Sequence, residues 1–115
     1  MLDKIFGTKT AELIMLHIFH YGEIHARGLA RDTDKSLSAI QKQLQKFEDA
    51  GVIISKKIGN VRVYRFNKKS PLTKPLIELV KVVHSSMSIS DKSILFSERK
   101  RPRRAGKPII SRNNS

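Results

Sequence analysis

One stretch of the chain, residues 36–66, decides the fold; it reads SLSAIQKQLQKFEDAGVIISKKIGNVRVYRF. In its first half, apolar residues recur at spacings of three, four and three, which is typical of a helix with one buried face. These residues are Leu37, Ile40, Leu44 and Phe47. Ser36 is a good N-cap, with Asp34 as an alternative, and Gly51 ends the helix.

The second half of the stretch changes to a strand pattern. Residues 52–58 and 61–66 are rich in β-branched and aromatic side chains, and Gly59-Asn60 separates them. This arrangement predicts a β-hairpin with a two-residue turn. The turn sets the register and predicts the pairs Ile58–Val61, Lys57–Arg62, Ser55–Tyr64 and Ile53–Phe66, with the aromatic residues on the core side.

Three further helices are predicted around this stretch, at residues 8–21, 26–31 and 72–84. The first is apolar on two faces, which requires a second packing layer or a partner subunit. The last carries a stripe formed by Leu72, Leu76, Leu79, Val80 and Val83. Ile24-His25 is either a short strand or a lead-in, and residues 32–35 form a turn.

The order of these elements is helix, short helix, turn, helix, hairpin, helix. The short helix, the turn and the helix after Ser36 form a helix-turn-helix unit, and the hairpin follows it as a wing. We therefore expect a mainly α fold with a β-hairpin wing (α+β), a winged helix-turn-helix. Residues 1–85 form the domain, and residues 86–115 form a flexible, disordered tail.

The outer face of the helix after Ser36 carries side chains that suit base edges in a DNA major groove. These are Ser38, Gln41, Lys42 and Gln45. An ordinary solvated helix face is the alternative, and the helix-turn-helix context favours DNA. A second set is expected to contact the phosphate backbone or the minor groove: Arg27, Arg31, Lys35, Ser36, Lys46, Lys56, Lys57, Asn60 and Arg62.

Charge supports a polyanionic partner. The 115 residues hold 23 Lys and Arg and 10 Asp and Glu, a formal charge of +13. The tail contributes 8 − 2 = +6 and residues 1–85 contribute 15 − 8 = +7, so the domain is basic without its tail. The basic block Arg99, Lys100, Arg101, Arg103 and Arg104 is either an arm on nucleic acid or a solvated tail.

Other classes of function find little support. The chain has no cysteine, which excludes disulfides and thiolate metal sites. His17, His20 and His84 are interpreted as exposed residues rather than a zinc site, so we expect no metal and no cofactor. No catalytic motif is present, so we expect no enzyme. The sequence shows no signal peptide or apolar spanning stretch, which favours a cytoplasmic protein without a membrane partner.

Residues 5–85 resemble the ArsR-like winged helix-turn-helix regulators. The resemblance lies in residues 6–10, 26–30, 37–53 and 59–67, with Gly28 where the family usually has Glu. It implies a homodimer formed through the first and last helices. Because the chain lacks cysteine, a soft-metal sensor is excluded.

The function that we expect is a sequence-specific regulator of double-stranded DNA, acting as a repressor. Two alternatives stay open. One is a protein-interaction module of the same fold, such as an antitoxin or adaptor. The other is an RNA-binding protein, although two Tyr, five Phe and no Trp leave few stacking platforms.

Overall fold

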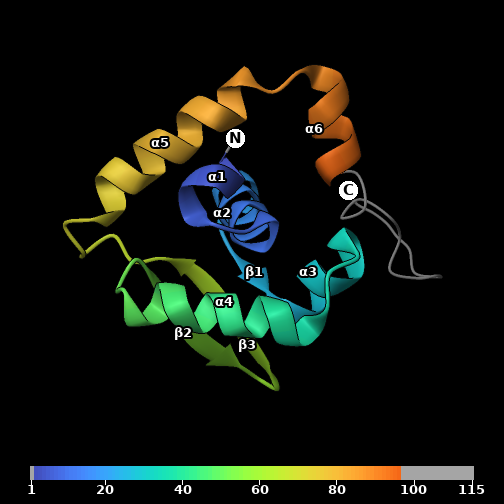
Figure 1. Cartoon of the computed structure of the whole chain (residues 1–115). Coiled ribbons are helices and arrows are strands. Elements are labelled where there is room, and N and C mark those ends of the chain that lie inside the picture. Colours follow the sequence, from blue (N-terminus) through green and yellow to red (C-terminus); the bar gives the residue numbers. More distant parts are fainter. Residues whose placement is uncertain (1, 97–115) are drawn as a thin grey trace, which may run out of the picture.

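The computed structural model describes residues 2–96 and shows six helices and three strands in that range (Figure 1). The elements are α1 (Leu2–Phe6), α2 (Lys9–Tyr21), β1 (Ile24–His25), α3 (Ala26–Thr33), α4 (Leu37–Asp49), β2 (Ile53–Ile58), β3 (Val61–Phe66), α5 (Thr73–Ser86) and α6 (Ile89–Phe96).

The helix-turn-helix unit consists of α3 and α4. Ser36 is the N-cap of α4, since its hydroxyl accepts a hydrogen bond of 3.1 Å from the amide of Ala39, as predicted. Asp34 ends α3 in a left-handed conformation with φ 60°. The helix α3 is longer than expected, because Asp32 and Thr33 belong to it rather than to the turn.

The three strands form one antiparallel sheet in the order β1-β3-β2. The hairpin pairs Ile58 with Val61 and Ile53 with Phe66, so the predicted register is confirmed. Gly59 begins the turn with φ 63°, a conformation that favours glycine. The short strand β1 pairs with β3 and ties the hairpin to α3. Together with α2, α3 and α4, this sheet is a winged helix.

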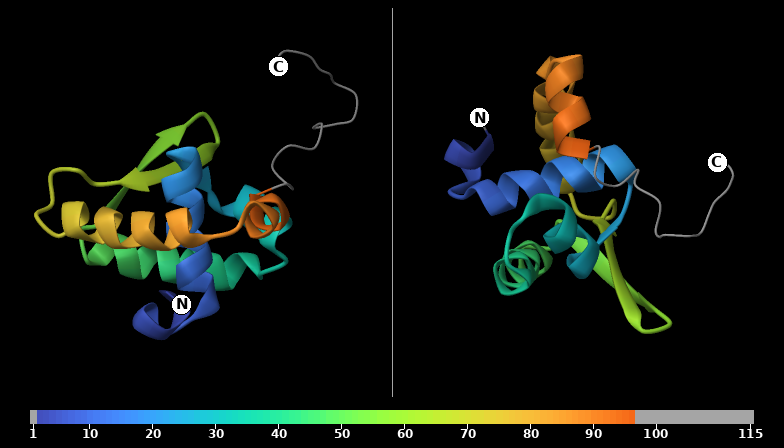
Figure 2. Two further views of the ribbon diagram at one scale, coloured as in Figure 1. Left: turned by 90° about the horizontal axis from the view of Figure 1, so that it is seen from above. Right: turned by 90° about the vertical axis from the view of Figure 1, so that its right-hand side faces the viewer.

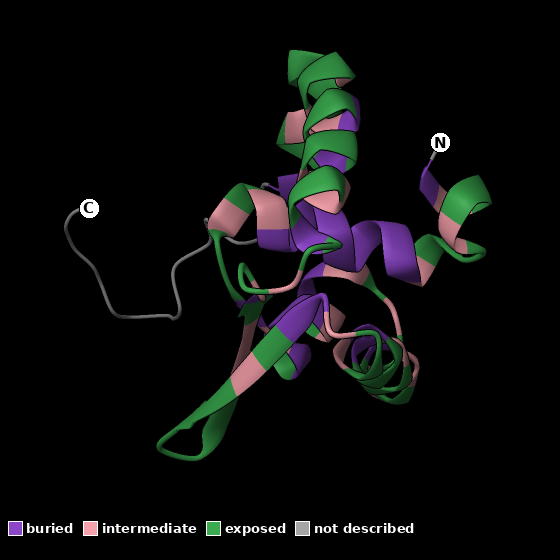
Figure 3. Ribbon diagram, turned by 90° about the vertical axis from the view of Figure 1, so that its left-hand side faces the viewer, coloured by how far each residue is buried: buried purple, intermediate pink, exposed green. Residues whose placement is uncertain are grey.

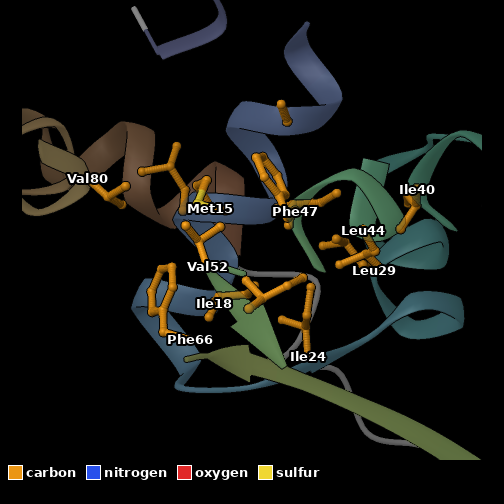
Figure 4. Close-up of a cluster of buried hydrophobic side chains, with 14 of the residues drawn as sticks. Met15, Ile18, Ile24, Leu29, Ile40, Leu44, Phe47, Val52, Phe66 and Val80 are labelled. Carbon is orange, nitrogen blue, oxygen red and sulfur yellow. The ribbon is translucent and has the colours of Figure 1, made fainter. Parts of the chain in front are cut away.

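The core surrounds α2, whose residues 11–18 are all buried. Ile18 lies beside Phe66 at the base of the hairpin, and Met15 faces Val80 of α5 (Figure 4). Helix α2 lies between α4 on one side and α5 on the other (Figures 1 and 2). The second apolar face of α2 is therefore covered by a second packing layer of the same chain.

The first helix, α1, was not predicted. It is held to α2 by Glu12, whose carboxylate accepts from the amide of Leu2 at 3.0 Å and pairs with the Lys9 ammonium at 2.7 Å. Burial alone would raise the pKa of Glu12, but the hydrogen bonds and positive charges of Lys9 and the chain's amino terminus together outweigh it and the pKa is lowered. Glu12 is therefore a buried carboxylate that keeps its charge.

Two expectations about the C-terminal part were wrong. Residues 89–96, assigned to a disordered tail, form α6, and its Phe96 is 2% exposed against α2. In the stripe predicted for α5, Val80 and Val83 are buried, but Leu72 is 59% and Leu79 36% exposed. The apolar surface of α5 exceeds what the described residues cover.

Helix α6 packs on a group of rings from α2 and α5. Phe96 stacks on His20 with a centroid distance of 3.8 Å, and Tyr21 donates a 2.7 Å hydrogen bond to the carbonyl of Phe96. His20 Nδ1 and His84 Nε2 lie 3.0 Å apart. His17 is fully buried, contrary to the expectation that it is exposed. The histidines thus help to anchor α6.

This packing predicts that stability falls in mild acid. Desolvation, and then the charge of Lys92, lower the pKa of His84 below its ordinary 6.5. In the acid range the unfolded chain therefore binds this proton more readily than the folded one, so the stabilisation is present above pH 6.5 and is lost as the pH falls through the folded pKa. Denaturant melts from about pH 7.5 to about pH 5 should show this decline in the free energy of unfolding. The slope of that free energy against pH should be smaller in His84→Gln. Equal slopes in His84→Gln, wild type and the control Lys81→Gln would contradict it.

Candidate nucleic-acid interface

Helix α4 presents two chemically different faces. Its apolar residues Ile40, Leu44 and Phe47 are buried. The opposite face consists of Ser38, Gln41, Lys42 and Gln45, which are all exposed. The four predicted base-contacting side chains therefore share one accessible surface. Gln45 donates a 2.9 Å hydrogen bond to Asp49, so part of its amide is already engaged.

The wing extends away from the core and is exposed at its tip (Figure 3). Lys56, Lys57 and Asn60 are exposed there, and Lys57 lies opposite Arg62 in the sheet. Like charges in this position repel each other and destabilise the hairpin. The tip therefore combines accessible positive charge with a repulsion that a bound anion would reduce.

A hydrogen-bond relay connects the wing to the end of α4. Arg62 Nη1 donates to Ser55 Oγ at 3.0 Å, and Ser55 Oγ donates to Glu48 Oε2 at 2.7 Å. Desolvation, and then the Glu48 charge, raise the pKa of nearby Tyr64. The relay holds Arg62 toward α4 and connects the wing to that helix, a contact that no sequence pattern indicates.

The short helix α3 carries Arg27 and Arg31, the two residues predicted to contact the DNA backbone from this helix. Both are exposed. Arg31 Nε lies 3.5 Å from Asp32 Oδ1. One backbone amide at the start of α3 is already engaged, because His25 Nδ1 accepts a 3.1 Å hydrogen bond from the amide of Gly28. A Cβ at residue 28 would lie 2.5 Å from the His25 ring, so a larger residue than glycine there would require the ring to move.

A shallow hollow of about 280 Å³ lies between the start of α2 and α4. Hydroxyl and ammonium groups line it, from Thr8, Thr10, Ser38, Lys42 and Lys46. Thr8 and Thr10 are thus brought next to the α4 face, although no sequence pattern indicates a role for them. Of the other predicted contacts, Lys35 is half-buried and the Ser36 hydroxyl is occupied as the cap of α4.

The remaining predictions concern the tail and metals. The block of residues 99–104 lies outside the described residues. Within residues 2–96, no group of three or more His, Cys, Asp or Glu side chains could hold a metal ion. His20 and His84 are in contact with each other. The buried His17 is engaged elsewhere, since its Nδ1 donates to the carbonyl of Leu13 at 2.7 Å. No described helix is long and apolar enough to cross a membrane.

Comparisons with known proteins add one similar solved structure, the AntR antimony-specific transcriptional repressor. It is 24% identical, with a TM-score of 0.48, and the match covers 64% of this chain and 65% of that chain, so it spans slightly less than two thirds of the repressor. No protein-family model matches the chain, and no curated protein matches it.

Proposed function

We propose that this protein is a sequence-specific double-stranded DNA-binding regulator that acts in the cytoplasm as a repressor. The observation that carries the proposal is the exposed face of α4, on which four polar or basic side chains lie together without a carboxylate before Glu48. In a winged helix, this is the helix that enters the major groove. Repression follows if the bound protein occupies DNA that the polymerase requires.

The side chains of α4 suit direct readout of bases. Gln41 can pair with the two major-groove groups of adenine, and Lys42 can donate to guanine. Gln45 is oriented by its hydrogen bond to Asp49, which leaves its carbonyl oxygen as an acceptor. Sequence preference therefore depends chiefly on Gln41 and Lys42 in this proposal.

The cations around α4 supply affinity rather than sequence preference. Lys56, Lys57 and Asn60 at the wing tip reach the backbone or minor groove next to the major-groove site. Arg27 and Arg31 contact phosphates on the other side of α4. In the hollow beside α4, Thr10 adds a hydroxyl donor next to Lys42 and Lys46. The lysines, the arginines and Asn60 are all exposed, which supports the assignment.

A double variant tests the readout. Replacing Gln41 and Lys42 with alanine should reduce the preference for the selected duplex over random duplex by about tenfold or more, since each good base contact contributes about 1–3 kcal/mol of discrimination. Competition binding measures the preference, and melting confirms that the variant is folded.

The matched control is Lys74→Ala with Lys81→Ala on α5, which should leave the preference unchanged. If the Gln41 and Lys42 double variant retains the full preference, the readout assignment is wrong. A protein-interaction module of the same fold would then be favoured.

The proposed assembly is a homodimer in which α5 contacts a second copy. Leu72, Leu79 and Val82 follow one exposed stripe at spacings of seven and three, and Val82 is 62% exposed. A stripe of this kind is covered in a dimer. Because α2 is already covered within the chain, α5 rather than α2 supplies the interface.

Sedimentation tests this assembly. Val82→Asp should convert a dimer to a monomer, because it places a carboxylate in an apolar contact. Lys81→Asp lies one residue away and outside the stripe. It should leave the dimer intact, although it changes the net charge more than Val82→Asp does. A wild-type monomer at the concentration that saturates DNA would refute the dimer.

A further inference from the structure

A second site lies away from the surface of α4. A cavity of about 760 Å³ opens between the end of α2, the base of the hairpin, the loop after β3 and α5. Ile54 and Arg65 pair with each other and lie on the sheet face opposite to Ser55 and Tyr64, which adjoin Glu48 of α4. The cavity is therefore separate from the proposed DNA-reading residues.

The wall of this cavity is largely apolar. Ile18 and Phe19 come from α2, Phe66 and Ile54 from the hairpin, and Ile77 from α5. Ile18 and Phe66 lie side by side at the base of the hairpin (Figure 4). A volume in this range and an apolar wall with two aromatic rings suit a small molecule with an aromatic or aliphatic body.

The charged residues of the same wall all have one sign. They are Arg65, Lys68 and Lys69, and no Asp or Glu lines the cavity. None of the three forms an ion pair within the described residues. Three neighbouring cations repel one another and favour an anion at this edge.

A smaller hollow of about 200 Å³ shares Lys68 and Ile77 with this cavity. Its wall also includes Lys74, Glu78 and the buried Thr73, and the described residues provide no hydrogen-bond partner for the Thr73 hydroxyl. A buried hydroxyl is normally paired with protein, water or ligand. The unpaired Thr73 hydroxyl therefore lies in a hollow that adjoins the cavity at Lys68 and Ile77.

We propose that this cavity binds a small organic anion, with a carboxylate or sulfonate held by Arg65 and Lys68 and an apolar body held against Phe19, Phe66 and Ile77. The site does not depend on the proposed DNA-binding function. This site differs from a surface that binds phosphate alone. Its apolar wall adds affinity only for a ligand that has an apolar body.

Two fluorescent probes test the site on the full chain. The first is 1-anilinonaphthalene-8-sulfonate, and the second is N-phenyl-1-naphthylamine, its uncharged parent. The sulfonate should bind the wild type at least about tenfold more tightly, one factor of ten being about 1.4 kcal/mol. Arg65→Gln with Lys68→Gln should remove that preference and leave binding of the uncharged probe within about twofold.

Controls separate this site from other surfaces. Lys42→Gln with Lys81→Gln removes the same charge elsewhere and should retain the preference, and Val82→Asp should do so even though it alters the exposed stripe of α5. Equal affinity for the two probes, or a preference unaffected by Arg65→Gln with Lys68→Gln, would overturn the proposal. Displacement of the sulfonate by equimolar inorganic phosphate would also overturn it, in favour of a simple oxyanion site.

Discussion

Binding of duplex DNA is expected to weaken by about a thousandfold when monovalent salt rises from about 50 mM to about 200 mM, because each neutralised phosphate releases condensed counterions. Seven cationic side chains per chain are assigned to the backbone or wing contacts. These are Arg27, Arg31, Lys35, Lys46, Lys56, Lys57 and Arg62. About six phosphate contacts suffice for an effect of this size.

The wing accounts for a defined part of this dependence. Lys56→Gln with Lys57→Gln should lower the slope of log affinity against log salt by about two per bound chain, whereas Arg62 is partly engaged by its relay to Glu48. Titrations at four salt concentrations would measure the slopes. The control Lys74→Gln with Lys81→Gln, with the same loss of charge, should leave the slope unchanged. Equal slopes in the two double variants would mean that net charge, not the wing, determines binding.

Phe96→Ala is expected to lower the free energy of unfolding by about 3 kcal/mol, the lower end of the range for a buried phenylalanine. The ring is 2% exposed and packs on His17, His20 and Tyr21. We expect the lower end because α6 is a short helix at the end of the described residues, and an element of this kind can open locally without unfolding the rest of a domain. Urea denaturation followed by circular dichroism would measure the change.

The matched control for Phe96 is Ile89→Ala at the other end of α6. Ile89 is 89% exposed, so its loss should change stability by less than about 0.5 kcal/mol. If Phe96→Ala is as stable as Ile89→Ala, α6 does not belong to the core. The domain boundary at residue 85 would then be correct after all.

The hairpin could be predicted residue by residue because one short turn determines its register. Gly59-Asn60 fixes Ile58 opposite Val61, and every other pair follows from the two-residue period. The helix α4 could likewise be predicted, since its cap at Ser36 and its apolar spacing agree. For these elements the local pattern and the tertiary packing favour the same structure.

The helix α6 could not be predicted because its local sequence pattern is weak. Its only fully buried side chain is Phe96, and a single anchor produces no periodicity. The preceding Ser-rich stretch also resembles a linker. The stabilising contacts come from His20 and Tyr21, which are distant in sequence. Short helices of this kind form through tertiary packing rather than propensity.

The candidate interface also has one part that follows from the local sequence pattern and one part that depends on tertiary packing. Exposure of Gln41 and Lys42 follows from the helical period, so the sequence indicates that face directly. The relay from Arg62 to Glu48 joins a strand to a helix end. No local pattern encodes this contact, because it depends on where the hairpin returns to α4 in space.

Selection of random duplex DNA by the full chain tests the DNA-reading role of α4 most directly. We expect a single recovered motif with two related half-sites about one helical turn apart, as a symmetric dimer requires. The same selection with Gln41→Ala and Lys42→Ala should lose the motif while salt-dependent binding persists. Recovery of no motif by the wild-type protein, at salt concentrations where it binds duplex, would contradict sequence-specific recognition by α4.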